Sequence, residues 1–269
     1  MNKLLQIVTI CMNNPEDLGI TLHSVASQET LPTRHIVVDS SDDGHSKIMR
    51  QLSQENMAEY FWCPPKGIYQ AMNFGISKLE SRGLCMFLNA GDYLATPDVV
   101  TKIFGTQLAG ENSWPMWAIG TLGISGNSRP ADQYALPKTP EIFSRRLKAG
   151  KIWLPHPSTV YRVGALGSIG YFEERLVIAA DYLFGLRMFQ KFGTPEILPF
   201  TLAVHQMGGV SSVMISRGAL ESSRARIRVF GKSLLPQESF RVVRIFAGAC
   251  RRWLCSRLSI EWLTKGHSQ

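Results

Sequence analysis

Residues 84–92 read LCMFLNAGD, a five-residue apolar run that ends at a polar turn. An apolar run of this length, bounded by turn residues, is typical of a strand buried on both faces of a sheet. Three β-rich runs precede it along the chain, at residues 4–10, 35–38 and 60–62. We therefore expect residues 84–88 to form a central strand, the fourth in sequence order.

Segments with apolar residues at helical spacing separate these four strands. They cover residues 18–28, 47–56 and 71–79, and Asn14 with Pro15 ahead of the first segment is typical of a helix start. The alternation of strand and helix predicts a parallel sheet with right-handed crossovers. The expected fold class is therefore α/β, with a ligand site at the carboxyl ends of the strands.

Polar side chains follow the second and fourth strands at this edge. Asp39 ends the second strand, where its carboxylate would accept hydrogen bonds from a nucleobase or ribose, or cap the next turn. Asn89 and Asp92 follow the fourth strand, where a hard oxygen ligand suits Mg²⁺ or Mn²⁺ holding phosphates. The alternative for the second group is an ordinary turn after a strand.

Three candidates lie in the second half of the chain. Asp181 stands near the start of an expected helix over 180–192, after an apolar run that would raise the pKa of its carboxyl toward general-base use. A helix-capping role is the alternative for Asp181. His156 and His205 are candidates for the acceptor side or the metal side of a site, or structural histidines.

Composition and motifs exclude several classes of protein. The chain has 269 residues, 45% hydrophobic and 19% charged, which argues against disorder and disulfide-rich scaffolds. Its apolar stretches are shorter than the ~18 residues that a bilayer span needs, and its start lacks a signal-peptide core, so we expect a cytoplasmic protein. The five cysteines form no CxxC pair, and no Walker A, HExxH or GxSxG motif is present.

Seven short motifs in order resemble family 2 glycosyltransferases with the GT-A fold, in particular the bacterial branch that builds exopolysaccharide, O-antigen and colanic acid units. Together they cover about residues 4–212. They are IVTI (7–10), IVVDSSDDG (36–44), GIYQAMNFGI (67–76), FLNAGD (87–92), HPST (156–159), ADY (180–182) and MGGVS (207–211). The resemblance implies a Rossmann-like, mostly parallel sheet flanked by helices.

The resemblance also implies roles for individual residues in holding a nucleotide diphosphate sugar. Thr9 and Asp39 match nucleotide-binding positions, and Asn89 with Asp92 stands at the family's DxD-type element, where Asp92 would bind Mn²⁺ or Mg²⁺. Met72 stands where many wider family members have arginine. Lys66 would supply that positive charge to the diphosphate, or is a solvated loop lysine.

On the acceptor side, Asp181 matches the catalytic base of the family. The implied reaction is an inverting, hexosyltransferase-type transfer to a hydroxyl of a lipid-linked saccharide at the cytoplasmic membrane face. Residues 1–216 would form the catalytic domain, with a nucleotide-sugar half over about 1–95 and an acceptor half over about 96–216. Two alternatives stay open: a nucleotidyltransferase, although residues 11–15 lack its glycine-rich loop, and a degenerate nucleotide-sugar binder, because this DxD-type element carries one carboxylate.

Residues 217–269 are expected to form a basic amphipathic helical tail. They hold 11 Lys and Arg against 3 Asp and Glu, so the whole net charge of +8 lies there. At 100° per residue, residues 241–254 place Val242, Phe246 and Trp253 on one face and Arg241 on the other, which suits a peripheral anionic membrane surface. Packing of the apolar face on the catalytic domain is the alternative, and no motif indicates nucleic-acid binding.

Overall fold

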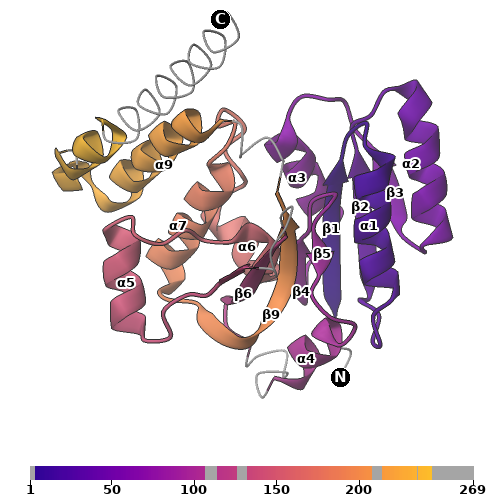
Figure 1. The fold of residues 1–269 in the computed structure, drawn as a ribbon, viewed down its shortest axis with the longest axis horizontal. Helices are drawn as coiled ribbons and strands as arrows, with labels where there is room; N and C mark the ends of the chain where they lie inside the picture. Colours follow the sequence, from indigo (N-terminus) through magenta and orange to yellow (C-terminus); the bar gives the residue numbers. More distant parts are fainter. Residues whose placement is uncertain (1–3, 107–113, 126–131, 208–213, 235, 244–269) are drawn as a thin grey trace, which may run out of the picture.

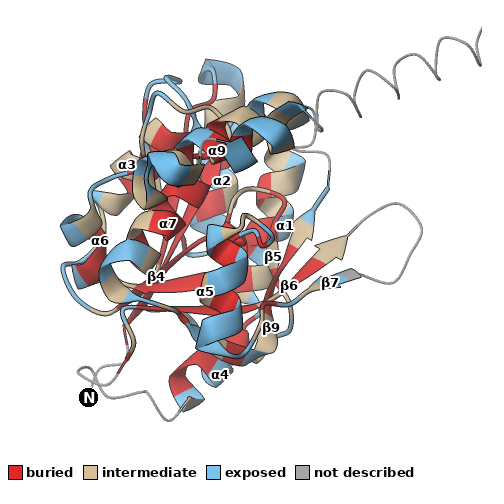
Figure 2. Cartoon of the chain, turned by 90° about the vertical axis from the view of Figure 1, so that its left-hand side faces the viewer, coloured by how far each residue is buried: buried red, intermediate tan, exposed pale blue. Residues whose placement is uncertain are grey.

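A computed structural model describes residues 4–106, 114–125, 132–207, 214–234 and 236–243 of the chain. The described part is one mixed sheet flanked by helices (Figure 1). Figure 2 shows that the inner strands of the sheet are buried and that the outer faces of the helices are exposed. No described helix combines the length and the hydropathy that a membrane crossing requires.

The first half of the sheet is parallel, as the sequence predicts. Its strands follow the order β3-β2-β1-β4, and all three pairings are parallel. The connecting helix α2 begins four residues earlier than expected, because Asp42 caps it by accepting a hydrogen bond from the His45 backbone N–H. The elements of this half are β1 (Leu5–Cys11), α1 (Pro15–Ala26), β2 (Arg34–Asp39), α2 (Asp43–Glu55), β3 (Glu59–Trp62), α3 (Ile68–Ile76) and β4 (Leu84–Phe87).

Alternate residues of β1 face opposite helices, which explains why its burial is continuous. Ile10 belongs to the core under α3, while Cys11 packs with residues of α1 and α2. Helix α3 lies so close to β1 that a Cβ at Gly75 would come within 2.5 Å of Val8 Cγ1. Glycine at residue 75 therefore allows α3 to pack closely on β1.

The second half of the sheet introduces antiparallel pairs that the sequence analysis did not resolve. Strand β8 runs antiparallel to β4, and the sheet continues through β6 and β9 to β5, with β7 paired to β6. The predicted helix over 180–192 is confirmed as α7 (Ala180–Phe192). The other elements are β5 (Tyr93–Leu94), α4 (Val99–Gly105), β6 (Trp117–Ser125), β7 (Asp132–Tyr134), α5 (Pro140–Lys148), η1 (His156–Ser158), β8 (Thr159–Arg162), α6 (Val163–Ile169) and β9 (Glu196–Gln206).

The segment after β9 packs on the sheet domain. Helix α9 (Ile215–Phe230) crosses the expected boundary and lies against α7 (Figure 1). A short turn, η2 (Lys232–Leu234), follows, and residues 236–243 are again helical. The Arg226 guanidinium and the Glu238 carboxylate, both buried, join α9 to this last helical segment at 2.7 and 2.5 Å.

Arg241, expected on the polar face of the tail helix, is bonded to the sheet domain. Its guanidinium donates hydrogen bonds to the carbonyls of Ala149 and Gly150, each at 2.6 Å. These carbonyls follow the last turn of α5, where acceptors are left without helical partners and a cation is favourable. The rest of the predicted amphipathic helix, residues 244–254, lies outside the described residues.

Candidate active site

Asp92 and His205 meet at the edge of the sheet, in the turn between β4 and β5 and near the end of β9. The Asp92 side chain is 3% exposed, and its Oδ1 accepts hydrogen bonds from His205 Nδ1 at 2.7 Å and from the Gln206 backbone N–H at 3.3 Å. The hydrogen bond and charge of Asp92 raise the pKa of His205, against the opposing effect of burial. The structure thus brings together two of the residues that the sequence indicated.

The backbone of this turn is fixed from α1. Thr21 Oγ1 donates to the Asp92 carbonyl at 2.7 Å and accepts from the Gly91 N–H at 3.0 Å. Gly91 has a φ of +94°, a conformation that side chains with a Cβ rarely adopt. A second carboxylate at residue 91 would therefore strain the backbone, which explains physically why this turn carries glycine between Asn89 and Asp92.

Two buried oxygen atoms of this turn fit a divalent cation. Asp92 Oδ2 and Asn89 Oδ1 are buried and have no hydrogen-bond partner within the described residues. A buried carboxylate oxygen without a partner is costly, and hard oxygen atoms are the ligands that Mg²⁺ and Mn²⁺ prefer. The described residues contain no cluster of three or more His, Cys, Asp or Glu side chains that could hold a metal ion. The donor set therefore suits a cation that takes further ligands from phosphate and water.

Asp39 organises the loop after β2 from a fully buried position. Its Oδ1 accepts hydrogen bonds from the Ser41 backbone N–H and hydroxyl, and its Oδ2 accepts from Tyr60 Oη at 2.8 Å. Both carboxylate oxygens are therefore engaged by the protein itself. The accessible group beside it is the Trp62 side chain, which is 46% exposed and donates from Nε1 to the Ser41 carbonyl at 2.9 Å.

Thr9 and Lys66 lie in contrasting surroundings. Thr9 is fully buried inside the sheet, where its hydroxyl is 2.9 Å from His35 Nε2, so its side chain does not reach the carboxyl edge. Burial lowers the pKa of His35 to about 4 and keeps that ring neutral. Lys66 is exposed in the loop between β3 and α3, at the same edge as Asp39.

Asp181 lies in the first turn of α7, two positions after the N-cap residue Ala179, so it is not the N-cap residue itself. Its Oδ1 accepts from the Tyr182 backbone N–H at 2.7 Å and from Tyr69 Oη at 3.3 Å. Burial raises the pKa of Asp181 to about 6, and the charge of Glu221 adds to the rise, while the hydrogen bonds oppose it. A carboxylate with this pKa can accept a proton near neutral pH.

His156 is a core residue in the structure. It is buried and stacks on the Phe87 ring at a centroid distance of 4.9 Å, with Phe172 packed edge-on at 5.4 Å. Burial lowers the pKa of His156 to about 3, so the ring is neutral. Its Nδ1 lies 3.4 Å from Tyr161 Oη. These contacts favour the structural alternative for His156 over a role on the acceptor side.

Sequence reasoning did not single out Tyr60, Trp62, Tyr69 or Glu221, which surround the candidate residues. Tyr60 and Trp62 are alternate residues of β3, and both side chains bond to the end of β2 and the loop after it, at Asp39 and Ser41. Tyr69 lies in the motif GIYQAMNFGI (67–76), but the sequence indicated no separate role for it. Glu221 is separated from Asp181 by 40 positions, so nothing in the local pattern connects the two residues.

Comparison with known proteins agrees with this geometry. The sequence profile described as Glycosyl transferase family 2 matches residues 6–162, more than half of the chain. The chain therefore belongs to glycosyl transferase family 2. A curated relative from Mycobacterium bovis and one from Mycobacterium tuberculosis, each named "PGL/p-HBAD biosynthesis glycosyltransferase", are 22% identical over 256 residues, covering 93% of this chain and 91% of each relative.

Solved structures share the fold at low sequence identity. A fragment of Staphylococcus aureus TarS, residues 1–349, superposes with a TM-score of 0.62 at 17% identity, covering 84% of this chain and 66% of the fragment. The mannosyltransferase PcManGT from Pyrobaculum calidifontis, in complex with GDP-Man and Mn²⁺, gives 0.54 at 12% identity, covering 95% and 79%. Glucosyl-3-phosphoglycerate synthase from M. tuberculosis, with Mn²⁺ and UDP, gives 0.57 at 14%, covering 84% and 79%. The expected GT-A fold is confirmed.

Proposed function

We propose that this glycosyltransferase moves a hexosyl group from a nucleotide diphosphate donor to an acceptor hydroxyl with inversion at the anomeric carbon. The observation that carries the proposal is a pair of carboxylates in two different surroundings. Asp92 presents an unpaired oxygen at the sheet edge, and Asp181 has a pKa raised to about 6 at the start of α7. The Asp92 carboxylate is therefore suited to binding a cation, and the Asp181 carboxylate is suited to accepting a proton.

On the donor side, Asp92 and Asn89 would hold Mn²⁺ or Mg²⁺ through the two unpaired oxygens, and His205 orients the Asp92 carboxylate. When bound, such a cation supplies positive charge against the departing diphosphate. Lys66 lies in an exposed loop at this edge and would add a second positive charge. The Trp62 indole offers an apolar surface to a nucleobase, and Asp39 holds the neighbouring loop in place.

On the acceptor side, Asp181 would take the proton of the attacking hydroxyl. The hydroxyl oxygen forms the new bond to the anomeric carbon as the bond to the diphosphate oxygen breaks, so a single displacement inverts the configuration. General-base assistance of this kind typically contributes about 10²–10⁴ in rate. The Tyr182 backbone N–H and Tyr69 Oη orient the carboxylate without neutralising it.

A lipid-linked saccharide of bacterial cell-surface polysaccharide synthesis is the proposed acceptor class, met at the cytoplasmic face of the membrane. Residues 217–269 hold 11 basic and 3 acidic residues, and this positive charge supports an anionic partner surface. Phe240 and Val243 in the helical segment 236–243 are 66% and 63% exposed, and apolar groups beside basic ones suit a membrane interface. No nucleic-acid partner is proposed.

The test is release of nucleoside diphosphate from a panel of UDP- and GDP-linked sugars, with and without Mn²⁺. Release that requires the cation and falls in Asp92→Asn supports an enzyme. A protein that binds UDP or GDP but releases none with any donor, even with added saccharide acceptors, would match the degenerate binder instead. That alternative is worth the test because the turn at residues 89–92 holds one carboxylate.

A further inference from the structure

Glu221 on α9 lies directly against the backbone that leads into α7. Its side chain is almost fully buried, and its Oε2 accepts hydrogen bonds from three successive N–H groups, those of Val177 at 3.1 Å, Ile178 at 2.8 Å and Ala179 at 3.1 Å. Arg217, one turn earlier on α9, donates to the other oxygen at 3.0 Å. This carboxylate therefore binds the backbone N–H groups of the three residues that precede the first turn of α7.

The turn needs such a partner because α7 lacks a side-chain cap of its own. The N-cap residue is Ala179, whose methyl group cannot accept a hydrogen bond. Helix N-termini leave backbone N–H groups without partners and carry a partial positive charge, so a carboxylate placed there is favourable. Glu221 supplies both the acceptor and the negative charge from a different helix.

The same turn is held from the opposite side by α3. Tyr69 Oη donates to the Ile178 carbonyl at 2.5 Å, so the Ile178 residue is bound through its N–H by α9 and through its carbonyl by α3. Helix α9 also approaches closely, because a Cβ at Gly218 would lie 3.0 Å from Ile178 Cγ2. Residues 177–179 are thus fixed between two helices.

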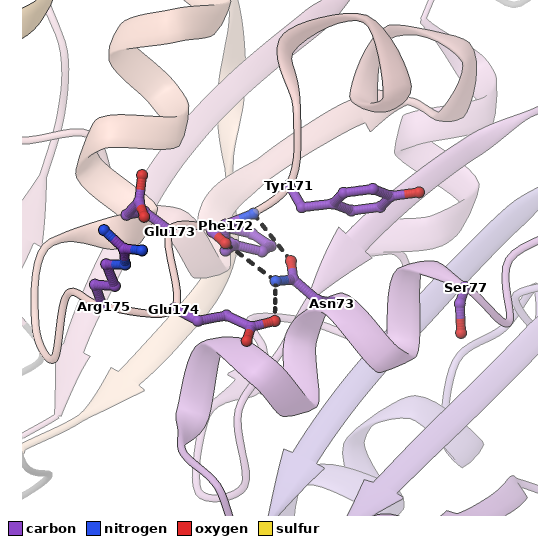
Figure 3. A pocket seen from close by; sticks show the side chains of 7 residues that line it. All are labelled: Asn73, Ser77, Tyr171, Phe172, Glu173, Glu174 and Arg175. Atoms are coloured by element: carbon purple, nitrogen blue, oxygen red, sulfur yellow. Dashed lines mark hydrogen bonds between the residues drawn. The ribbon is translucent and has the colours of Figure 1, made fainter.

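The segment just before this turn is anchored to α3 as well. Figure 3 shows the Asn73 carboxamide bonded to the backbone of Phe172, accepting from its N–H at 2.9 Å and donating to its carbonyl at 3.0 Å. Asn73 also donates to Glu174 at 2.9 Å. These residues line an open cavity of about 480 Å³ on the flank of α3. Asn73 and Tyr69 on α3, with Glu221 on α9, therefore fix the whole approach to Asp181.

We propose that Glu221 is a positioning residue for the catalytic base, so that helix α9 contributes to catalysis. The proposal rests on the proposed function, because it assumes that Asp181 accepts the acceptor proton. Glu221 does not contact Asp181; it acts through the turn at 177–179, which sets where the first turn of α7 begins.

Substitutions of Glu221 separate its effect on the backbone that precedes α7 from its effect on the pKa of Asp181. In Glu221→Gln, the amide oxygen can occupy the place of Oε2 and keep the three backbone hydrogen bonds, while the negative charge is lost. The titratable groups that face Asp181 are Tyr69 from α3, Tyr161 from β8 and Glu221 from α9. Glu221 is the anion among these described groups, and removing its charge lowers the pKa of Asp181, so the acid limb of kcat/KM moves to lower pH. Plateau kcat should stay within about threefold, because geometry is kept.

In Glu221→Ala both the acceptor and the charge are lost. We expect kcat to fall by about tenfold or more with little change in donor KM, because a small misplacement of a catalytic group is costly. Glu221→Asp, with a shorter side chain, should recover part of this loss. Thermal unfolding of each variant shows whether it is folded; if Glu221→Ala fails to fold, the acid limb of Glu221→Gln still decides the matter.

Glu173→Gln is the matched control. Glu173 also pairs with an arginine of α9, Arg228 at 3.0 Å, and with Arg187 of α7 at 3.6 Å, but it forms no hydrogen bond with residues 177–179. Its acid limb and kcat should match the wild type. An unmoved acid limb in Glu221→Gln, with unchanged kcat in Glu221→Ala, would overturn the positioning role. If Asp181→Asn itself retains normal turnover, the proposed function fails instead, and the two failures are thereby distinguished.

Discussion

Replacing Tyr69 by phenylalanine removes one hydroxyl whose two contacts bear directly on the proposed base. Tyr69 Oη lies 2.5 Å from the Ile178 carbonyl and 3.3 Å from Asp181 Oδ1. The hydroxyl has one proton to donate, so its hydrogen bond to the nearer Ile178 carbonyl is the stronger of the two. The hydrogen bond still favours the ionised form of Asp181, so its loss raises the pKa of that carboxyl.

The size of this effect follows from ordinary hydrogen-bond energies. A shared bond at 3.3 Å belongs at the low end of the usual range, about 0.5–1 kcal/mol. Since 1.4 kcal/mol corresponds to a tenfold change in the ionisation equilibrium, losing this bond should raise the pKa of Asp181 above its value of about 6 by less than one pH unit. A base works in its ionised form, so activity is lost as pH falls through this value.

The assay is the pH profile of kcat/KM for nucleoside diphosphate release between pH 4.5 and 8.5. The acid limb of Tyr69→Phe should lie roughly half a pH unit above that of the wild type, opposite in direction to Glu221→Gln. Phe61→Leu, which alters an aromatic side chain packed on α3 away from Asp181, serves as the control. An acid limb that stays in place, or moves to lower pH, would refute the assignment of Asp181 as the titrating base.

Three further variants test other parts of the structure. Trp62→Ala should weaken UDP or GDP affinity, by about 1–3 kcal/mol if a base stacks on the indole, while leaving the acid limb unchanged; equal affinity by calorimetry would exclude the stacking role. Gly75→Ala should destabilise the fold by about 1–3 kcal/mol, because its Cβ would clash with Val8; an unchanged urea midpoint would contradict the close packing. Arg226→Met should cost about 3–5 kcal/mol by leaving buried Glu238 unpaired, and wild-type stability would argue against that ion pair.

The parallel half of the sheet could be predicted because its physics is local. Apolar runs with β-rich composition and turn residues mark β1 to β4, and the alternation with helices sets their parallel order. The antiparallel half was not predictable in the same way. Strand β8 pairs with β4 and β6, both of which precede it by more than 30 residues of sequence, and nothing in its four residues specifies those partners.

The candidate site shows the same division between local and distant information. Asp39, Asp92 and Asp181 were recognisable from where they stand, at or after the ends of strands or in the first turn of a helix. The local pattern did not predict the burial of two other candidates. The Thr9 hydroxyl forms a hydrogen bond with the buried His35 ring, and aromatic side chains pack around His156. Burial of a polar residue depends on elements far along the chain, which a local pattern does not contain.

The tail illustrates how one contact changes an interpretation. Helical periodicity alone placed Arg241 on the polar face, opposite the apolar one, but its guanidinium is bonded to the carbonyls of Ala149 and Gly150 after α5. A truncation near residue 217 would also remove Glu221 and Arg226, so it would test stability and catalysis together with membrane binding. Phe240→Ser with Val243→Ser in the full chain is the cleaner variant, and we expect it to sediment less with anionic vesicles than the wild type does.

The most direct test of the account compares donor-side and acceptor-side carboxylates in one calorimetric experiment, titrating UDP and GDP with Mn²⁺ present into Asp92→Asn and Asp181→Asn. The account predicts that Asp92→Asn loses the Mn²⁺-dependent part of nucleotide affinity. It predicts that Asp181→Asn keeps that affinity, although its turnover falls by about 10²–10⁴. Loss of nucleotide affinity in Asp181→Asn, with full affinity in Asp92→Asn, would contradict the assignment of the two carboxylates.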